Sequence, residues 1–152
     1  MNRQRGLLSP WLTIRVQLAL AALFIAAGIA KIVDPPGFAH EIHNYALLPD
    51  AAVNGLALFL PWLEVLTGLA LFLGFWRRAA AGIFAVLLVV FIGALSINLA
   101  RGRPVDCGCF GASKAPKTEA QRFSDMKIAI ARDVGMLLMA AQLLLATRRQ
   151  SP

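Results

Sequence analysis

The sequence predicts an all-α integral membrane protein that folds as a four-transmembrane-helix bundle, and two observations support this expectation. Hydrophobic residues make up 59% of the 152 residues, and they gather into four long blocks instead of recurring at the spacing of an amphipathic helix. A helix needs roughly 20 mostly apolar residues to cross a bilayer whose hydrocarbon is about 30 Å thick. Each block reaches that length, so we expect one four-helix domain over residues 1–152.

The boundaries of the spans follow from the polar residues between the blocks. We expect helices at residues 12–32, 51–75, 79–100 and 128–146. Asp34-Pro35-Pro36-Gly37 is expected to end the first helix and Pro49-Asp50 to start the second, with a loop between them. Trp76-Arg77-Arg78 leaves room only for a tight turn before the third helix. Residues 101–127 form the longest polar connection, which carries both cysteines.

Two features of the apolar blocks bear on how the helices pack. Ala22, Ala26 and Ala30 recur at a four-residue spacing that lets membrane helices approach closely, so they indicate packing within the bundle. Pro61 has no backbone N–H to donate, so we expect it to kink the second helix and to open space beside Glu64.

The net charge of +7 has an ordinary explanation in a membrane protein. Basic loops fix the orientation of such proteins and meet anionic lipid headgroups. We therefore expect membrane lipid, and no nucleic acid, among the partners of this chain.

The only two cysteines of the chain, Cys107 and Cys109, are separated by Gly108. A disulfide requires Cα atoms about 4.4–6.8 Å apart, and residues two positions apart meet that requirement only with a bent backbone, which glycine tolerates. So small a ring should be strained, and strained, exposed disulfides are the labile kind used in exchange. Nearby basic residues would stabilise a thiolate, while Asp106 would oppose them. The pair is our candidate catalytic site for thiol–disulfide exchange.

Two other interpretations of the cysteines stay open. In the first, the cysteines form a disulfide or remain two free thiols, and they only shape the loop. In the second case, Cys107 and Cys109 would join His40 and His43 from the first loop to complete a tetrahedral metal site. The metal interpretation is the weaker one, because this spacing is less specific than paired C-x-x-C motifs.

The orientation of the bundle rests on charge and on redox chemistry. Four crossings place both termini on one side, and the basic residues divide almost evenly between the two sides. The terminal-side bases sit against helix ends without acidic neighbours, and disulfide chemistry belongs on the oxidising, extracytoplasmic face. We expect a multi-pass protein of the bacterial inner membrane with cytoplasmic termini and a periplasmic cysteine loop. A signal peptide ending at Gly28-Ile29-Ala30 is the alternative, although its apolar run would be long for one.

Several short motifs accompany the cysteine pair. The most specific is Asp106-Cys107-Gly108-Cys109-Phe110-Gly111, and the shorter ones are Ala30-Lys31-Ile32, Tyr45-x-Leu47-Leu48-Pro49, Pro61-x-x-Glu64 and Arg132-Asp133. Together with four helices in about 150 residues, these motifs make the chain resemble the MauE branch of the DoxX-like redox-associated membrane proteins.

This resemblance implies an inner-membrane factor that helps a periplasmic redox enzyme to mature, with a thiol- or disulfide-bearing client as its partner. In the methylamine system the client would be the disulfide-rich small subunit of methylamine dehydrogenase. Quinone-linked disulfide-forming membrane enzymes carry a second, relaying cysteine pair, which this chain lacks. A thiol–disulfide oxidoreductase built on Cys107 and Cys109 would pass electrons directly to a partner or to a bound membrane quinone.

Charged and polar residues inside the spans are costly, and those retained tend to face the bundle interior and to mark function. Glu64 lies near the middle of the second span and is expected to be neutral or to pair with Lys31 or Arg132. We expect a shared polar pocket beneath the cysteine loop that could hold a quinone headgroup, formed by Glu64, Lys31, Asn98, Arg132 and Asp133. The alternatives are a structural ion pair at Glu64 and snorkelling of the basic side chains to the headgroups.

Two other functions compete with thiol–disulfide exchange. A small proton-coupled transporter would use Glu64 as its coupling acid, since intramembrane carboxylates commonly relay protons. A non-catalytic membrane scaffold would use neither Glu64 nor the cysteines chemically.

Overall fold

The computed structural model describes residues 9–106 and 117–148, and within them every regular element is a helix. The helices are α2 (Pro10–Val33), α3 (Pro35–Asn44), α4 (Asp50–Leu73), α5 (Arg77–Ala100) and α6 (Glu119–Arg148). Four of them, α2, α4, α5 and α6, are long and apolar enough to cross a membrane. The predicted all-α, four-span membrane fold is therefore confirmed.

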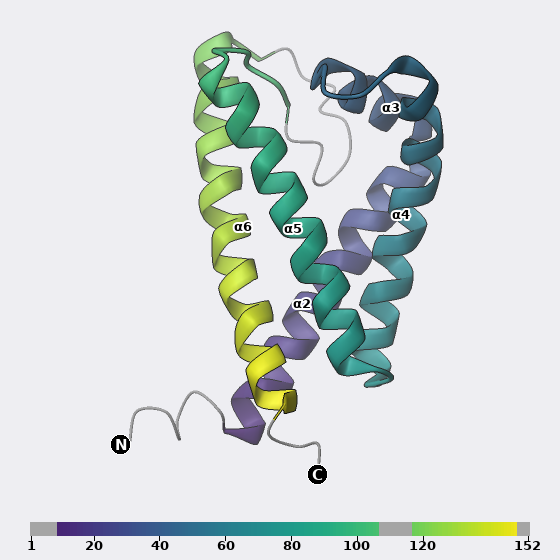
Figure 1. Cartoon of the computed structure of the whole chain (residues 1–152), viewed down its shortest axis with the longest axis vertical. Helices are drawn as coiled ribbons and strands as arrows, with labels where there is room; N and C mark the ends of the chain where they lie inside the picture. The colour runs from purple at the N-terminus through teal and green to yellow at the C-terminus, as the bar shows by residue number, and fades with distance from the viewer. Residues whose placement is uncertain (1–8, 107–116, 149–152) are drawn as a thin grey trace.

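The four long helices form two pairs that diverge toward one end (Figure 1). Helix α2 packs along α4, and α5 packs along α6. The start of α2, the end of α6 and the turn between α4 and α5 lie at the end where the pairs meet. Helix α3 and residues 101–106, which follow α5, lie at the opposite end, where the pairs separate. We call these the terminal end and the α3 end.

The expected loop over residues 33–50 is wrong in one respect, because most of it forms α3. Two prolines stand at the start of α3, where their missing N–H groups cost nothing, since the first turn has no intrahelical acceptors for them. Asp34 caps this turn by accepting a hydrogen bond from the Gly37 amide at 3.1 Å. The residues interpreted as a helix stop therefore end α2 and begin α3.

Helix α6 begins at Glu119 and not near residue 128. Thr118 and Gln121 form a reciprocal cap. The Gln121 amide donates to Thr118 Oγ1 at 3.3 Å, and the Thr118 amide donates to Gln121 Oε1 at 2.9 Å. This capping box satisfies two amides that the first turn leaves without partners. The polar first turns of α6 thus extend the helix beyond its apolar span.

Glycines, and not the predicted alanine stripe, bring α2 and α4 together. A Cβ placed on Gly28 would lie 2.6 Å from Val65 Cγ2 and 2.8 Å from the Pro61 carbonyl oxygen. Gly68 meets α2 in the same way. Ala22 and Ala26 are exposed and Ala30 is half-buried, so among the described residues the stripe as a whole does not form the close helix contact that was expected of it.

Two apolar clusters stabilise the bundle. The larger lies across all four long helices toward the terminal end and includes Phe24 and Phe84, whose rings stack with centroids 3.8 Å apart. The smaller joins α5 and α6 at the α3 end and contains Tyr45, Val105 and Met126. Between the clusters the helix pairs are separated, and this is where the candidate site lies.

Candidate functional site

A buried ion pair between α2 and α4 is the first component of the site. Lys31 Nζ lies 2.6 Å from Glu64 Oε1 and 2.8 Å from Glu64 Oε2, and both residues are buried, at 4% and 7% exposure. Lys31 also lies over the Phe38 ring, with Nζ 5.0 Å from the ring centroid. Of the two partners expected for Glu64, the structure shows Lys31.

A second buried carboxyl, Asp133 on α6, is only 1% exposed. Arg132 donates to its Oδ1 from Nε at 3.0 Å and from Nη2 at 2.9 Å. Asp133 Oδ2 has no hydrogen-bond partner among the described residues. Since an unsatisfied buried acceptor is costly, this oxygen is a candidate contact for a ligand.

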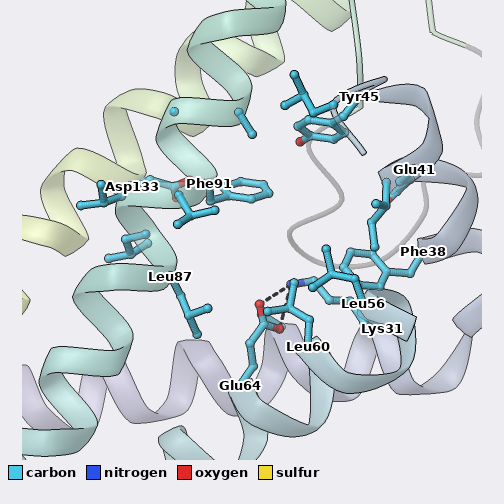
Figure 2. Close-up of a pocket in the computed structure, with 18 of the residues that line it drawn as sticks. Lys31, Phe38, Glu41, Tyr45, Leu56, Leu60, Glu64, Leu87, Phe91 and Asp133 are labelled. Carbon is cyan, nitrogen blue, oxygen red and sulfur yellow. Dashed lines mark hydrogen bonds and ion pairs between the residues drawn. The ribbon is translucent and has the colours of Figure 1, made fainter. Parts of the chain in front are cut away.

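These groups line one cavity of about 410 Å³ between the two helix pairs. Figure 2 shows Lys31, Glu64 and Phe38 on one side of it, and Asp133 and Phe91 on the other. Most of the remaining lining is aliphatic and comes from α2, α4 and α5. The cavity is therefore apolar with a few charged groups, a composition typical of small-molecule sites.

The structure brings together four of the five residues expected to form a polar pocket: Lys31, Glu64, Arg132 and Asp133. Asn98 does not line the cavity. It is fully buried, and its Nδ2 donates back to the Ala94 carbonyl of its own helix at 3.1 Å. Asn98 is therefore placed near the α3 end of α5 without a cavity contact.

Helix α3 supplies residues that the sequence analysis missed. Phe38, Glu41, Ile42 and Tyr45 all line the cavity. Their spacing of i, i+3, i+4 and i+7 is that of one helix face. This spacing could have predicted the helix from the sequence. It was not recognised as helical, because the prolines before it were interpreted as the start of a loop.

A second, polar cavity of about 570 Å³ lies at the α3 end. It is lined by residues of α3 and of the connection after α5, with one from α6, and its polar lining residues include His40, Glu41, Asn44, Arg103, Asp106 and Arg122. Glu41 lines both cavities, so the two adjoin at α3. We call the first the inner cavity and the second the outer cavity.

Asp106, on the wall of the outer cavity, is held by two basic residues. Lys117 Nζ lies 3.5 Å from Asp106 Oδ1, and Arg122 Nε lies 3.9 Å from Asp106 Oδ2. Lys117 also donates to Asp125 at 2.8 Å, and this hydrogen bond raises the pKa of the Lys117 ammonium above its usual value. The basic groups thus offset the negative charge beside the predicted cysteine site.

Cys107 and Cys109 lie outside the described residues; in the sequence Cys107 follows directly on Asp106. Within residues 9–106 and 117–148, no group of three His, Cys, Asp or Glu side chains could hold a metal ion. His40 lines the outer cavity, and His43 Nδ1 lies 3.1 Å from Asp50 Oδ1. Among the described residues, neither histidine therefore belongs to a group of three possible metal ligands.

The chain is similar in sequence to a known protein family. A family model described as methylamine utilisation protein MauE matches residues 9–146. The methylamine utilization protein MauE of Paracoccus denitrificans is 38% identical over 105 residues, which cover 68% of this chain and 56% of that protein. The protein of the same name from Methylophilus methylotrophus is 37% identical over 101 residues, covering 66% and 53% respectively.

A more distant relative has another name. Protein TlpB of Flavobacterium psychrophilum is 32% identical over 132 residues, covering 80% of this chain and 35% of that protein. The chain spans about half the length of the curated MauE relatives that it matches. No solved structure matches it at a significant level. Since the MauE family model covers nearly all of the described bundle, the chain belongs to the MauE family of methylamine utilisation proteins.

Proposed function

We propose that this protein is a thiol–disulfide exchange factor of the bacterial inner membrane that helps a periplasmic redox enzyme to mature. The family is named for methylamine utilisation, so the small subunit of methylamine dehydrogenase is the first client to test. Cys107 and Cys109 carry the exchange.

The observation that carries this proposal is the setting of Asp106, the residue that precedes Cys107. It lines a polar cavity at the α3 end, opposite the start of α2 and the end of α6, and it is paired with Lys117 and Arg122. Positive charge stabilises a thiolate, and an acidic neighbour opposes that effect unless it is itself neutralised. The ion pairs of Asp106 therefore favour a reactive cysteine immediately after it.

The exchange balances without any further reactant. One client thiolate attacks the Cys107–Cys109 disulfide, which breaks that bond and forms a mixed disulfide with release of one cysteine thiol. The second client thiolate then attacks the client sulfur of the mixed disulfide and releases the other cysteine thiol. The client gains one disulfide, and the two cysteines of the membrane protein become thiols. The reverse direction, which reduces a wrong client disulfide, uses the same groups.

Replacement of both cysteines tests the proposal against its alternatives. A protein that carries Cys107→Ser and Cys109→Ser should accumulate in the membrane like the parent but leave the client with free thiols. The measurement is the number of alkylatable thiols in the periplasmic client, determined by mass spectrometry. Ser124→Ala, an exposed change at the same end of the bundle, is the control and should leave client thiols oxidised.

The same measurement separates the competing functions. A proton-coupled transporter or a non-catalytic scaffold does not use the thiols, so in either case the double serine protein would still support full oxidation of the client. That result would reject thiol–disulfide exchange.

A further inference from the structure

The inner cavity is lined by α4 and α5, two helices that diverge toward the α3 end (Figure 1). Leu56 and Leu60 of α4 line it, and so do Val90, Gly93 and Ile97 of α5. Ile97 and Val90 are also exposed on the bundle surface. Since exposed apolar residues of a membrane-spanning helix face lipid, these lining residues give a ligand dissolved in the bilayer a lateral route to the cavity between α4 and α5.

The charge of the cavity selects against anionic lipids. Its ionisable lining residues are three carboxyls, Glu41, Glu64 and Asp133, and two basic groups, Lys31 and Arg132. Arg132 is engaged by Asp133, and Lys31 by Glu64. A fatty acid or a phosphate headgroup would find no unneutralised cation here, whereas a neutral molecule keeps both ion pairs intact.

The hydrogen-bonding groups on the two walls fit a ligand with oxygen atoms on opposite sides of a ring. An ammonium group has three donors, and Glu64 engages Lys31 through its two oxygens, which leaves Lys31 able to donate to a carbonyl oxygen. On the facing wall, Asp133 Oδ2 lacks a donor among the described residues. Phe38, on the side of Lys31, and Phe91, on the side of Asp133, also line the cavity and supply aromatic contacts for a flat ring (Figure 2).

We propose that the inner cavity binds a neutral, lipid-soluble quinone through its headgroup, and that this quinone accepts the electrons of the cysteine pair. The quinone carbonyl accepts from Lys31, and after reduction a quinol hydroxyl donates to Asp133 Oδ2. The apolar route between α4 and α5 takes the tail. The electron-accepting role depends on the proposed exchange function, whereas the binding does not.

The redox step balances in electrons and protons. The Cys107 and Cys109 thiols lose two electrons and two protons as the S–S bond forms. The quinone takes up two electrons and two protons and becomes the quinol. Glu41 lines both the inner and the outer cavity, and we assign it the transfer of protons between the outer cavity, where Asp106 lies, and the quinone.

Binding is tested first in a protein without cysteines, so that its outcome is independent of thiol exchange. The Cys107→Ser, Cys109→Ser protein is placed in lipid nanodiscs and illuminated with a photoreactive azido-ubiquinone, with and without excess ubiquinone-1. We expect labelling of cavity-lining peptides of α4, α5 and α6 that ubiquinone-1 abolishes. Labelling that excess ubiquinone-1 leaves unchanged would overturn the proposal.

Two glycines of α5 provide a matched pair of variants. A Cβ on either Gly93 or Gly82 would meet no atom within 4 Å, but only Gly93 lines the inner cavity. Gly93→Leu should therefore fold and fill part of the cavity, weakening competition by ubiquinone-1 at least 10-fold, while Gly82→Leu leaves it unchanged. Asp133→Asn, which removes the charged acceptor of the quinol hydroxyl, should weaken competition by the reduced form, ubiquinol-1, several-fold. Equal competition in all of these proteins would contradict a quinone site in this cavity.

The electron transfer is then measured with both cysteines present. The protein is reduced, freed of reductant and mixed anaerobically with ubiquinone-1. We expect one quinol for each disulfide formed, and a slower reaction in Gly93→Leu than in Gly82→Leu. Specific binding without quinol formation would overturn the electron-accepting role.

Discussion

The Lys31–Glu64 pair fixes the chemical character of the inner cavity. Two charges buried in a membrane bundle are costly singly and are retained when each neutralises the other. The 2.6 Å contact joins α2 to α4, and it also places a cation on the cavity wall without adding net charge. The ion pair therefore holds α2 against α4, and it also provides the donor for the proposed ligand.

A double-mutant cycle measures this coupling. Lys31→Met and Glu64→Gln each leave one charge buried without its partner, so each should lower the free energy of unfolding by roughly 3 kcal/mol. The double variant removes both charges and should lose much less than the sum of the two. The measurement is unfolding in detergent, followed by far-UV circular dichroism. Strictly additive losses would show that the two side chains do not interact.

Among individual residues, the sequence predicted the site members whose residue type is rare in an apolar span. Lys31, Glu64, Arg132 and Asp133 were found because charges in apolar spans are unusual, and four helices leave few places for them to meet. Asn98 was misplaced because an asparagine can donate its amide nitrogen to a carbonyl of its own helix, as Asn98 does to Ala94. Glu41 was missed because its burial depends on α3, which was not expected.

Helix α3 closes one side of the site, and its position follows from the lengths of its neighbours. Gly28 packs beside Pro61. From Pro61, α4 continues to Asp50 for roughly 16 Å, whereas α2 continues from Gly28 only to Val33, roughly 8 Å. Helix α3 packs against the part of α4 that α2 leaves uncovered. The sequence predicted both long helices. It did not predict how far α4 extends beyond α2, because that difference depends on which residues of the two helices are in contact, and the contacts of Gly28 set this register.

The cap of α3 is a specific target. Asp34→Ala removes the acceptor of the Gly37 amide and should destabilise α3 by about 1 kcal/mol. Asp34→Asn retains a capping oxygen and should behave like the parent. Hydrogen exchange of the α3 amides, measured by mass spectrometry, should be faster in the alanine variant alone. Equal exchange in both variants would show that the cap does not stabilise α3.

The contact between α2 and α4 is tested by two glycine-to-alanine changes. Gly28→Ala places a Cβ within 3 Å of α4 and should destabilise the bundle, because the backbones must separate. Gly55→Ala meets no atom within 4 Å, and it should be neutral or stabilising, since alanine is favoured over glycine in a helix by about 1 kcal/mol. Thermal unfolding in detergent compares them. A neutral Gly28→Ala would contradict the close packing.

At the scale of the whole molecule, the two helix pairs meet at the terminal end and separate at the α3 end. The sequence predicted this difference between the two ends only in part. The lengths of the apolar blocks predict four spans, and hence that the first span begins and the last span ends on the same side, as the start of α2 and the end of α6 do in Figure 1. The divergence of the two helix pairs could not be read from the sequence, because it depends on which small residues make contact. Gly28 and Gly68 do so, while Ala22 and Ala26 face outward.

The orientation of the bundle follows from the proposed function. In a protein without Cys107 and Cys109, single cysteines at Ala120 and Ala79 report on the α3 end and the terminal end, and both positions are exposed. A membrane-impermeant maleimide should label Ala120→Cys in intact spheroplasts and Ala79→Cys only after lysis. The reverse pattern would place the cysteine loop in the cytoplasm and contradict periplasmic exchange.

Capture of the covalent intermediate tests the exchange at Cys107 and Cys109 most directly. When one cysteine attacks a client disulfide and the other is absent, the mixed disulfide has no partner to resolve it. Cells expressing Cys107→Ala or Cys109→Ala are treated with an alkylating agent, and proteins attached to each variant are identified after release with reductant. We predict that one of the two holds a periplasmic protein and that the double variant holds none. If neither variant captures a protein while both support full client oxidation, the account is contradicted.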